Sequence, residues 1–206
     1  MSALPVEAAQ AQPLAVVEQL RERIRTLEGG PARTPVPVHP VLQDVVAMRV
    51  GTSYTVDTAS LALAMAAGAS AAGEWVGFAG WSDFGAEAAA QWGIDLGRTV
   101  LVPEPGEHWL EVVAALVDVL RVVVLCPPGR VDPKSMSVVE ARLRARSAAL
   151  VVWGEWSSPE ARLTTEHTEW TGAGRGEGRL RERQVRIAVR RGARQPTRAD
   201  LVFPTG

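Results

Sequence analysis

From about residue 48 onward, apolar strand-like segments alternate with single helix-like segments, and this order limits the possible folds more than any other feature. The strand-like segments lie at 48–56, 74–80, 99–104, 121–128 and 148–154, with helix-like segments between them at 59–73, 84–93, 108–120 and 135–147. Strands separated by single helices need right-handed crossovers, which place helices on both faces of a mostly parallel sheet. We therefore predict a doubly wound α/β core.

The pattern changes after Pro159. Polar and apolar residues alternate over 161–170 and 183–190, on either side of a glycine-rich turn, and a further short apolar segment covers 199–203. Alternation with a period of two is typical of strands with one buried face. The region 160–203 is thus predicted to form an antiparallel hairpin with a third strand, added to one edge of the parallel sheet.

The N-terminal region, 1–28, is predicted to contain an amphipathic helix, because 14–28 carries apolar residues at helical spacing. This apolar face comprises Val17, Leu20, Ile24 and Leu27. Residues 29–40 are rich in glycine and proline, which favour a linker, and 41–203 would form the main domain. The helix has two interpretations: it contacts another molecule, including a second copy of the chain, or it packs on its own domain.

Composition excludes several classes of protein. The net charge is −1 at pH 7, so the overall balance does not indicate a nucleic-acid or membrane partner. A single cysteine, Cys126, excludes an intramolecular disulfide framework and favours a reducing compartment. No apolar segment approaches the length of a bilayer span. We expect a cytoplasmic protein.

Several stretches carry a resemblance to a known fold family. EWVGFAG (74–80), WGIDLGRTVLVPEP (92–105) and HWLEVVAALVDVLRVVVL (108–125) resemble consecutive parts of the RecA ATPase core. The span 41–203 also resembles the RecA-like ImuA-type proteins of actinobacteria, in phrases such as VVVLCPPGR (122–130) and TEWTGAG (168–174). The resemblance implies a RecA-like three-layer αβα core with C-terminal antiparallel strands.

The residues needed for ATP chemistry are missing. A phosphate-binding loop needs glycines and a lysine between strand and helix, but YTVDTASLALA (54–64) has neither, and Lys134 is the only lysine of the chain. Asp57 would place a negative charge there. Cys126 follows the segment that resembles the Walker B strand, and the resemblance puts Trp81 where RecA proteins carry a catalytic glutamate. We expect no ATP hydrolysis and no cofactor.

Other catalytic or metal sites are not indicated. The histidines His39, His108 and His167 are isolated, without the spacing of metal ligands. Cys126 could be a nucleophile, although a buried cysteine that packs as a small hydrophobe is the more ordinary interpretation. Among the tryptophans, Trp75 and Trp153 are expected in the core. Others at strand or helix ends, such as Trp81, could anchor a partner or fill the emptied nucleotide site.

The segment 175–198 is rich in arginine and has only two glutamates, Glu177 and Glu182. This basic surface could contact DNA phosphates or an acidic partner, or be an ordinary solvated hairpin. Its candidate partner-binding residues, beside the N-terminal helix face, are Arg179, Arg183, Arg186, Arg190 and Arg191.

The resemblance also implies a function: a non-catalytic adaptor in DNA-damage-induced mutagenesis. It would bind an ImuB-like protein and support translesion synthesis by an error-prone C-family polymerase, near the nucleoid after DNA damage. Two alternatives are a modulator that binds DNA or RecA filaments, and a SulA-like inhibitor of cell division. No residue is predicted to be catalytic, to bind a cofactor or to hold a metal.

Overall fold

The computed structural model describes the backbone of 34–174 and 177–204 and, outside 173–181, the side chains. The predicted N-terminal helix, with Val17, Leu20, Ile24 and Leu27, lies outside the described residues, as does the side chain of Arg179. The chain divides into two units, of which the second, Pro35–Gly206, contains the predicted main domain.

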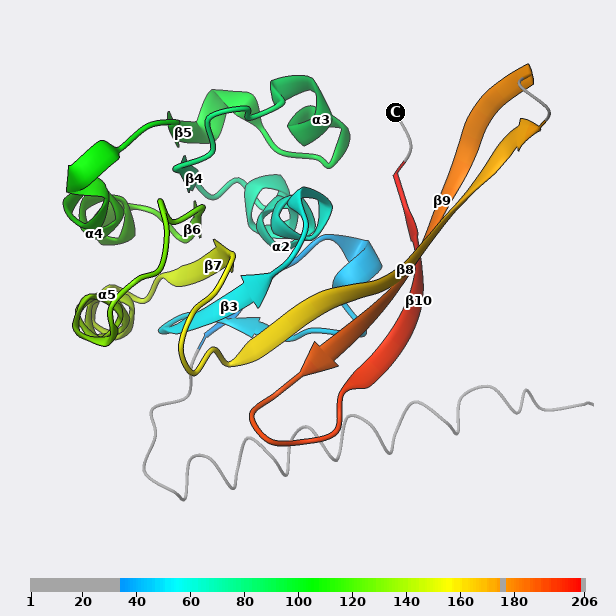
Figure 1. The fold of residues 1–206 in the computed structure, drawn as a ribbon. Helices are drawn as coiled ribbons and strands as arrows, with labels where there is room; N and C mark the ends of the chain where they lie inside the picture. The colour runs from blue at the N-terminus through cyan, green and yellow to red at the C-terminus, as the bar shows by residue number, and fades with distance from the viewer. Residues whose placement is uncertain (1–33, 175–176, 205–206) are drawn as a thin grey trace, which may run out of the picture. The chain divides into compact units, whose positions relative to one another are not determined.

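An eight-stranded mixed sheet forms the centre of this domain, in the order β10-β9-β8-β3-β7-β6-β4-β5 (Figure 1). Its strands are β3 (Thr52–Val56), β4 (Val76–Ala79), β5 (Thr99–Val102), β6 (Val122–Leu125), β7 (Ala149–Trp153), β8 (Ala161–Gly174), β9 (Glu177–Arg190) and β10 (Thr197–Phe203). Strands β3 to β8 pair in parallel, whereas β9 is antiparallel to both of its neighbours. The predicted mixed α/β fold with a mostly parallel sheet and C-terminal antiparallel strands is therefore confirmed.

Helices cover both faces of the parallel part of the sheet. Helices α4 (Trp109–Val119) and α5 (Pro133–Arg146) pack on one face with β6 and β7, while α2 (Ala59–Ala71) and α3 (Ala86–Gln91) pack on the other (Figure 1). Side-chain caps begin α2 and α5: the Thr58 hydroxyl accepts from the Leu61 amide, and the Asp132 carboxylate accepts from the Ser135 amide. These caps fix where each helix starts after its strand.

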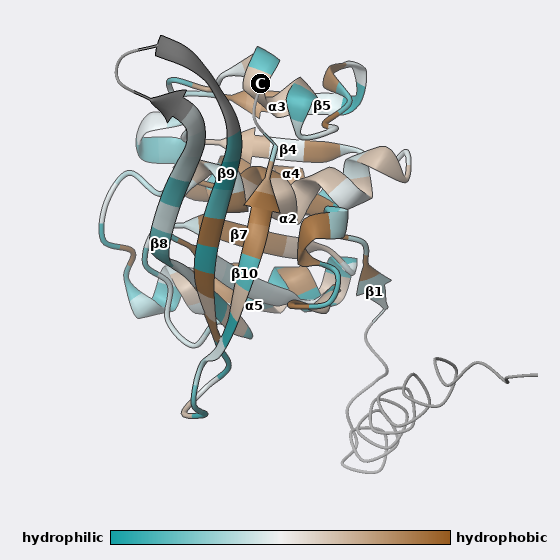
Figure 2. Cartoon of the chain, turned by 90° about the vertical axis from the view of Figure 1, so that its right-hand side faces the viewer, coloured by the Kyte–Doolittle hydropathy of each residue, from teal (hydrophilic) through white to brown (hydrophobic). Residues whose placement is uncertain are grey.

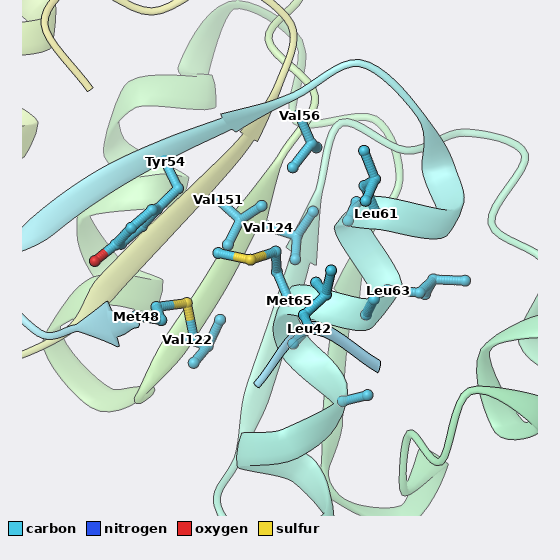
Figure 3. Packing of buried hydrophobic residues seen from close by; sticks show 14 of the residues in the cluster. Leu42, Met48, Tyr54, Val56, Leu61, Leu63, Met65, Val122, Val124 and Val151 are labelled. Carbon is cyan, nitrogen blue, oxygen red and sulfur yellow. The ribbon is translucent and has the colours of Figure 1, made fainter. Parts of the chain in front are cut away.

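Helix α2 is enclosed on nearly every side. Ten of its residues are buried, and Leu61 and Met65 lie against Val124 and Val151 of the sheet (Figure 3). Alanine predominates in α2 because large side chains would not fit between the sheet and the segment before it. At Gly68 an added Cβ would collide with the backbone of Val38, so glycine allows this close approach.

Residues 35–42 belong to the domain. Strand β1 (Pro35–Val36) pairs with β2 (Met48–Arg49), Val36 is buried, and the His39 amide donates to the carbonyl of Ala64 in α2. The sequence places 29–40 in a linker because its prolines prevent regular structure, but prolines are compatible with an edge strand and with the first turn of a helix. The domain boundary therefore lies at Pro35 and not at residue 41.

The C-terminal strands extend well beyond the parallel part of the sheet (Figure 1). Hydrophilic and hydrophobic residues alternate along them (Figure 2), and Val185, Ile187 and Val189 of β9 are buried on the face toward α2. The pairing of β8 with β9 shifts between Thr165 and His167, where a bulge changes the register. Among the described residues, no helix is both long and apolar enough to span a bilayer.

One ion-pair cluster joins the two helices of the α4/α5 face and predicts a pH dependence. The Asp118 carboxylate accepts two hydrogen bonds from the Arg142 guanidinium, and the Nε of Arg146 lies 3.2 Å from it. The hydrogen bonds from Arg142 lower the pKa of Asp118, with a smaller contribution from Arg146. A lowered folded-state pKa stabilises the protein above the ordinary carboxyl pKa, and this stabilisation is lost as the pH falls through the folded-state value.

We therefore expect Asp118→Asn to lower the melting temperature at pH 7 and to have progressively less effect below about pH 4. Thermal melts of both proteins between neutral and acidic pH measure this difference. Asp44→Asn provides a control on an exposed carboxylate. A difference between wild type and Asp118→Asn that stays constant down to the lowest pH at which both fold would contradict the prediction.

Candidate functional site

The carboxyl ends of β3, β4, β6 and β7 meet at one edge of the sheet, where open α/β sheets bind their ligands. Residues that follow these strands are Asp57, Gly80, Trp81, Cys126 and Gly154. This edge is also where the resemblance places the nucleotide site.

Aromatic rings pack against one another at the part of this edge that follows β4. Trp81 is only 5% exposed, and its ring centroid lies 4.8 Å from that of Trp153, at the end of β7, and 5.4 Å from that of Phe84. Phe78 of β4 contacts both Trp81 and Phe84. Of the two interpretations for Trp81, the one in which rings fill the site agrees with this geometry, since a nearly buried ring cannot anchor a partner.

Two other tryptophans lie close to strand ends. Trp75, expected in the core, is 50% exposed because it precedes β4 and does not lie within it. Trp156 follows β7 but is buried, and its indole N–H donates to the Glu140 carboxylate of α5. The strand boundary accounts for the exposure of Trp75, because a shift of one or two residues in that boundary moves a side chain from core to surface.

The junction between β3 and α2 carries a carboxylate that is already bonded. The Asp57 carboxylate accepts hydrogen bonds from the amide (2.7 Å) and the hydroxyl (3.3 Å) of Thr165 in β8. Its backbone carbonyl accepts from the indole of Trp153 at 3.2 Å. Asp57 thus ties β3 to β7 and β8. An anion approaching this junction would meet a negative charge.

Two hollows lie on either side of Gly154 and Glu155. The first, about 350 Å³, is lined by Thr55, Arg162 and Thr164 among others, and the second, about 490 Å³, by Pro127 and Arg130. The hydroxyl of Thr55 is buried and has no hydrogen-bond partner within the described part of the chain. Both hollows combine acidic and basic residues, so their charge does not select one class of ligand.

Cys126 is half-buried at the end of β6. Burial raises the pKa of its thiol to about 12, and the nearby Asp83 acts in the same direction. A thiol with this pKa is almost entirely protonated at neutral pH, and only the thiolate is a good nucleophile. Of the two interpretations for Cys126, the geometry favours the small packed hydrophobe.

We accordingly expect the folded protein to react with iodoacetamide at pH 7.5 far more slowly than the same chain in denaturant, by about three orders of magnitude if thiolate fraction alone sets the rate. Mass spectrometry of timed samples measures both rates. Since Cys126 is the only cysteine, every alkylation event reports on it. Equal rates in the two states would contradict the packed interpretation.

The histidines are separate in space as in sequence. No group of three His, Cys, Asp or Glu side chains among the described residues could hold a metal ion. The Nδ1 of His39 accepts from the Val41 amide at 3.2 Å, and its ring contacts Trp92. Burial lowers the pKa of His39, which keeps the ring neutral. His39 therefore caps a helical turn.

The arginines of the C-terminal strands divide between two faces of the sheet. Arg186 and Arg190 point away from α2, whereas Arg183, on the same face as the buried Val185, points toward it. Arg191 donates to the carbonyl of Val45 at 2.9 Å and so anchors the end of β9. The structure thus does not bring the described members of the predicted set, Arg183, Arg186, Arg190 and Arg191, together on a single surface.

Two arginines of the outer face are paired with carboxylates. Arg186 and Asp200 form a bidentate pair at 2.7 and 3.0 Å, and the Nε of Arg198 lies 2.8 Å from Glu166. The pairing lowers the pKa of Asp200, mainly through its hydrogen bonds with Arg186. Both carboxylates lie outside the segment 175–198, so the sequence overestimates the free positive charge of this surface.

Arg183 has a different environment, which sequence reasoning missed. Its guanidinium carbon lies 5.3 Å from the ring centroid of Trp170 and 5.4 Å from that of Phe203, and its Nη1 donates to the Ser60 hydroxyl at 2.7 Å. Its Nε is buried and has no partner in the described regions. The register places Trp170, Arg183 and Phe203 opposite one another on three adjacent strands. No local sequence signal gives that register.

Comparison with known proteins covers the parallel part of the domain. Residues 40–158, which run from the turn before β2 to the loop after β7, match the family described as the MT3502 N-terminal domain. The chain is also 36% identical, over 156 residues, to the uncharacterized protein Rv3395c of Mycobacterium tuberculosis. That alignment covers 71% of this chain and 74% of the relative. On both grounds, the chain belongs to the MT3502 N-terminal domain family.

Proposed function

We propose that this protein is a non-catalytic adaptor with a RecA-like fold, which acts in DNA-damage-induced mutagenesis. It binds an ImuB-like protein and thereby supports translesion synthesis by an error-prone C-family polymerase. The observation that carries the proposal is that rings and a bonded carboxylate occupy the sheet edge where a RecA-like ATPase would hold nucleotide.

The arrangement of strands supports the RecA-like part of the proposal. Strand β3 takes the place of the strand before the phosphate-binding loop, and β6 takes that of the Walker B strand. One strand, β7, separates them, so their carboxyl ends open on the same edge. The antiparallel strands β9 and β10 follow at the far side of β8, in agreement with the order that the resemblance implies.

The chemistry at this edge supports the non-catalytic part. Phosphoryl transfer depends on positive charges and metal ligands placed around the phosphates. The turn after β3 offers the Asp57 carboxylate, the residue after β6 is a protonated thiol, and Trp81 fills the space after β4. Lys134 lies in the first turn of α5 and not at the start of α2. With these residues the edge stabilises the fold.

A protein partner fits the surface better than DNA does. Duplex or single-stranded DNA is held by several unpaired Lys or Arg side chains that follow the phosphates. On the outer face of the C-terminal strands, Arg186 and Arg198 are already neutralised by Asp200 and Glu166. The arginine-rich segment therefore has less free charge for phosphate than its composition indicates.

The direct test is co-purification of the full chain with the ImuB-like protein of the same organism, at low and at high salt. We expect a stable complex at both, together with weak binding of single-stranded DNA by the chain alone. Failure to form the complex would overturn the adaptor proposal. Tight, strongly salt-dependent DNA binding would favour the DNA- or filament-binding alternative instead.

Point substitutions suit this test better than truncation. Deletion of the chain after Gly172 would remove β9 and β10, which contribute Val185, Ile187, Val189 and Phe203 to the core. Loss of binding by such a truncation could then reflect unfolding. Substitutions of exposed residues on these strands, such as Arg190, leave the core intact.

A further inference from the structure

Arg183 lies partly out of water and has no counter-ion among the described residues. Arg186 and Arg198 each pair with a carboxylate on a neighbouring strand. Within the described residues, no carboxylate oxygen lies within 4.0 Å of the Arg183 guanidinium, and its one side-chain acceptor is the neutral hydroxyl of Ser60. This arginine is nevertheless the one that lies on the inner face, partly out of water.

Burying an unpaired charge is costly, because the protein must replace the hydrogen bonds and the solvation that water gave. Burial lowers the pKa of Arg183, which is the expected sign of this cost. The rings of Trp170 and Phe203 offset part of the cost of burying this charge through cation–π contacts. The buried Nε still has no acceptor in the described part of the chain. A carboxylate that approached the accessible part of the Arg183 side chain would supply the missing negative charge.

The cluster is closed on one side and open on the other. Phe203 is buried and contacts Trp92, the residue after α3, whose ring in turn contacts His39, so a row of rings supports the guanidinium from within. Trp170, at the opposite end, is 47% exposed. Tryptophan and arginine are among the residue types most enriched at the binding hot spots of protein interfaces.

We propose that Trp170, Arg183 and Phe203 form a docking site for an acidic segment of a partner protein, which places a carboxylate on Arg183 and an apolar side chain on Trp170. The inference rests on the proposed function in taking the partner to be a protein, and it adds the chemistry by which that partner is recognised.

Charge complementarity favours a carboxylate on a protein over a nucleic-acid backbone. A single recessed guanidinium can neutralise one anion, whereas a phosphate backbone brings a row of them. On the outer face, Arg186 and Arg198 are already paired with Asp200 and Glu166, so they offer little free charge to further phosphates. A planar carboxylate matches the fork of a guanidinium, and a peptide carries the adjacent apolar group that Trp170 needs.

The test uses the full-length wild-type chain and two short peptides, acetyl-Leu-Asp-Phe-amide and acetyl-Leu-Asn-Phe-amide. NMR titration follows the indole N–H of Trp170 and the Nε–H of Arg183. We expect the aspartate peptide to shift both signals with a dissociation constant on the order of 1 mM, and the asparagine peptide to bind about tenfold more weakly or not at all.

Substitutions at two arginines of β9 test which of them binds the peptide. Arg183→Met should abolish the shifts caused by the aspartate peptide, whereas Arg190→Met, an exposed arginine of the outer face of the same strand, should leave them unchanged. Arg183→Lys keeps the charge without the planar fork and should weaken binding about tenfold. It also serves as the decisive variant if thermal melts show that Arg183→Met does not fold.

Equal binding of the two peptides, equal loss in Arg190→Met, or no shift with either peptide would overturn the inference. The same shifts on addition of oligo(dT) in place of the peptide would assign the site to phosphate and overturn it as well. None of these measurements contains the ImuB-like protein. Failure of the adaptor proposal and failure of the docking site are therefore distinguishable.

Discussion

The substitution Gly80→Ala is expected to lower the free energy of unfolding of the domain by about 2–6 kcal/mol, which is a large share of the stability of an ordinary domain. Gly80 follows β4 with a φ of +76°, which side chains rarely adopt. An added Cβ would also collide with the backbone carbonyl of Cys126. That carbonyl cannot move away easily, since the Cys126 amide donates to Ala79 and the Gly80 amide donates to Val102. Strain and collision therefore act together.

Gly93→Ala is the matched control for this substitution. Gly93 has a φ of +85°, but an added Cβ would meet nothing within 4 Å. It should therefore show the cost of strain alone, about 1–3 kcal/mol. Urea denaturation followed by tryptophan fluorescence gives both free energies of unfolding. Equal losses in the two variants would mean that the close approach of β4 and β6 at this edge is not as the structure has it.

The second large effect is expected at Trp81. Trp81→Ala removes a ring that contacts Trp153, Phe78 and Phe84, and should cost about 3–5 kcal/mol, because the surrounding rings cannot fill the space. Trp75→Ala is the control with the same chemical change at a side chain that is 50% exposed, and should cost less than about 1 kcal/mol. Chemical denaturation of both variants provides the comparison.

Comparison of Trp81→Ala with Trp75→Ala distinguishes the two possible roles of the Trp81 ring. If the ring at the end of β4 were a partner anchor, its removal would change stability no more than removal of Trp75. A loss several times larger at Trp81 would agree with a ring that packs as part of the core at the end of β4. ATP binding should not appear in Trp81→Ala, because the emptied space still lacks a lysine and a glycine turn.

The sequence predicts the parallel core well because strands such as β6 and β7 are short apolar runs and single helix-like segments separate the strands. Strand segments such as 122–125 have no polar residue that could place them elsewhere. The residues at which a strand begins or ends are harder to predict from sequence. Trp75 lies in an apolar run but precedes β4, and Pro35–Val36 form a strand that proline-rich composition conceals. Tertiary contacts decide both cases.

For the candidate site, the sequence shows which phosphate-binding residues are missing, but it does not predict which side chains contact one another. The missing glycine turn and lysine can be identified by inspection, because a phosphate loop is a local motif. The bond from Asp57 to Thr165 joins residues far apart in the chain. The pairs Arg186–Asp200 and Trp170–Arg183 depend on the register of β8, β9 and β10, including a bulge near His167. A shift by one residue would exchange the inner and outer arginines.

Calorimetric titration of the full-length chain with ATP and Mg²⁺ tests the central claim most directly. The claim is that the edge formed by Asp57, Trp81 and Cys126 is a packed part of the fold and not a nucleotide site. We predict no measurable heat of binding at millimolar ATP, with or without Mg²⁺. Saturable, magnesium-dependent binding in the micromolar range would contradict it.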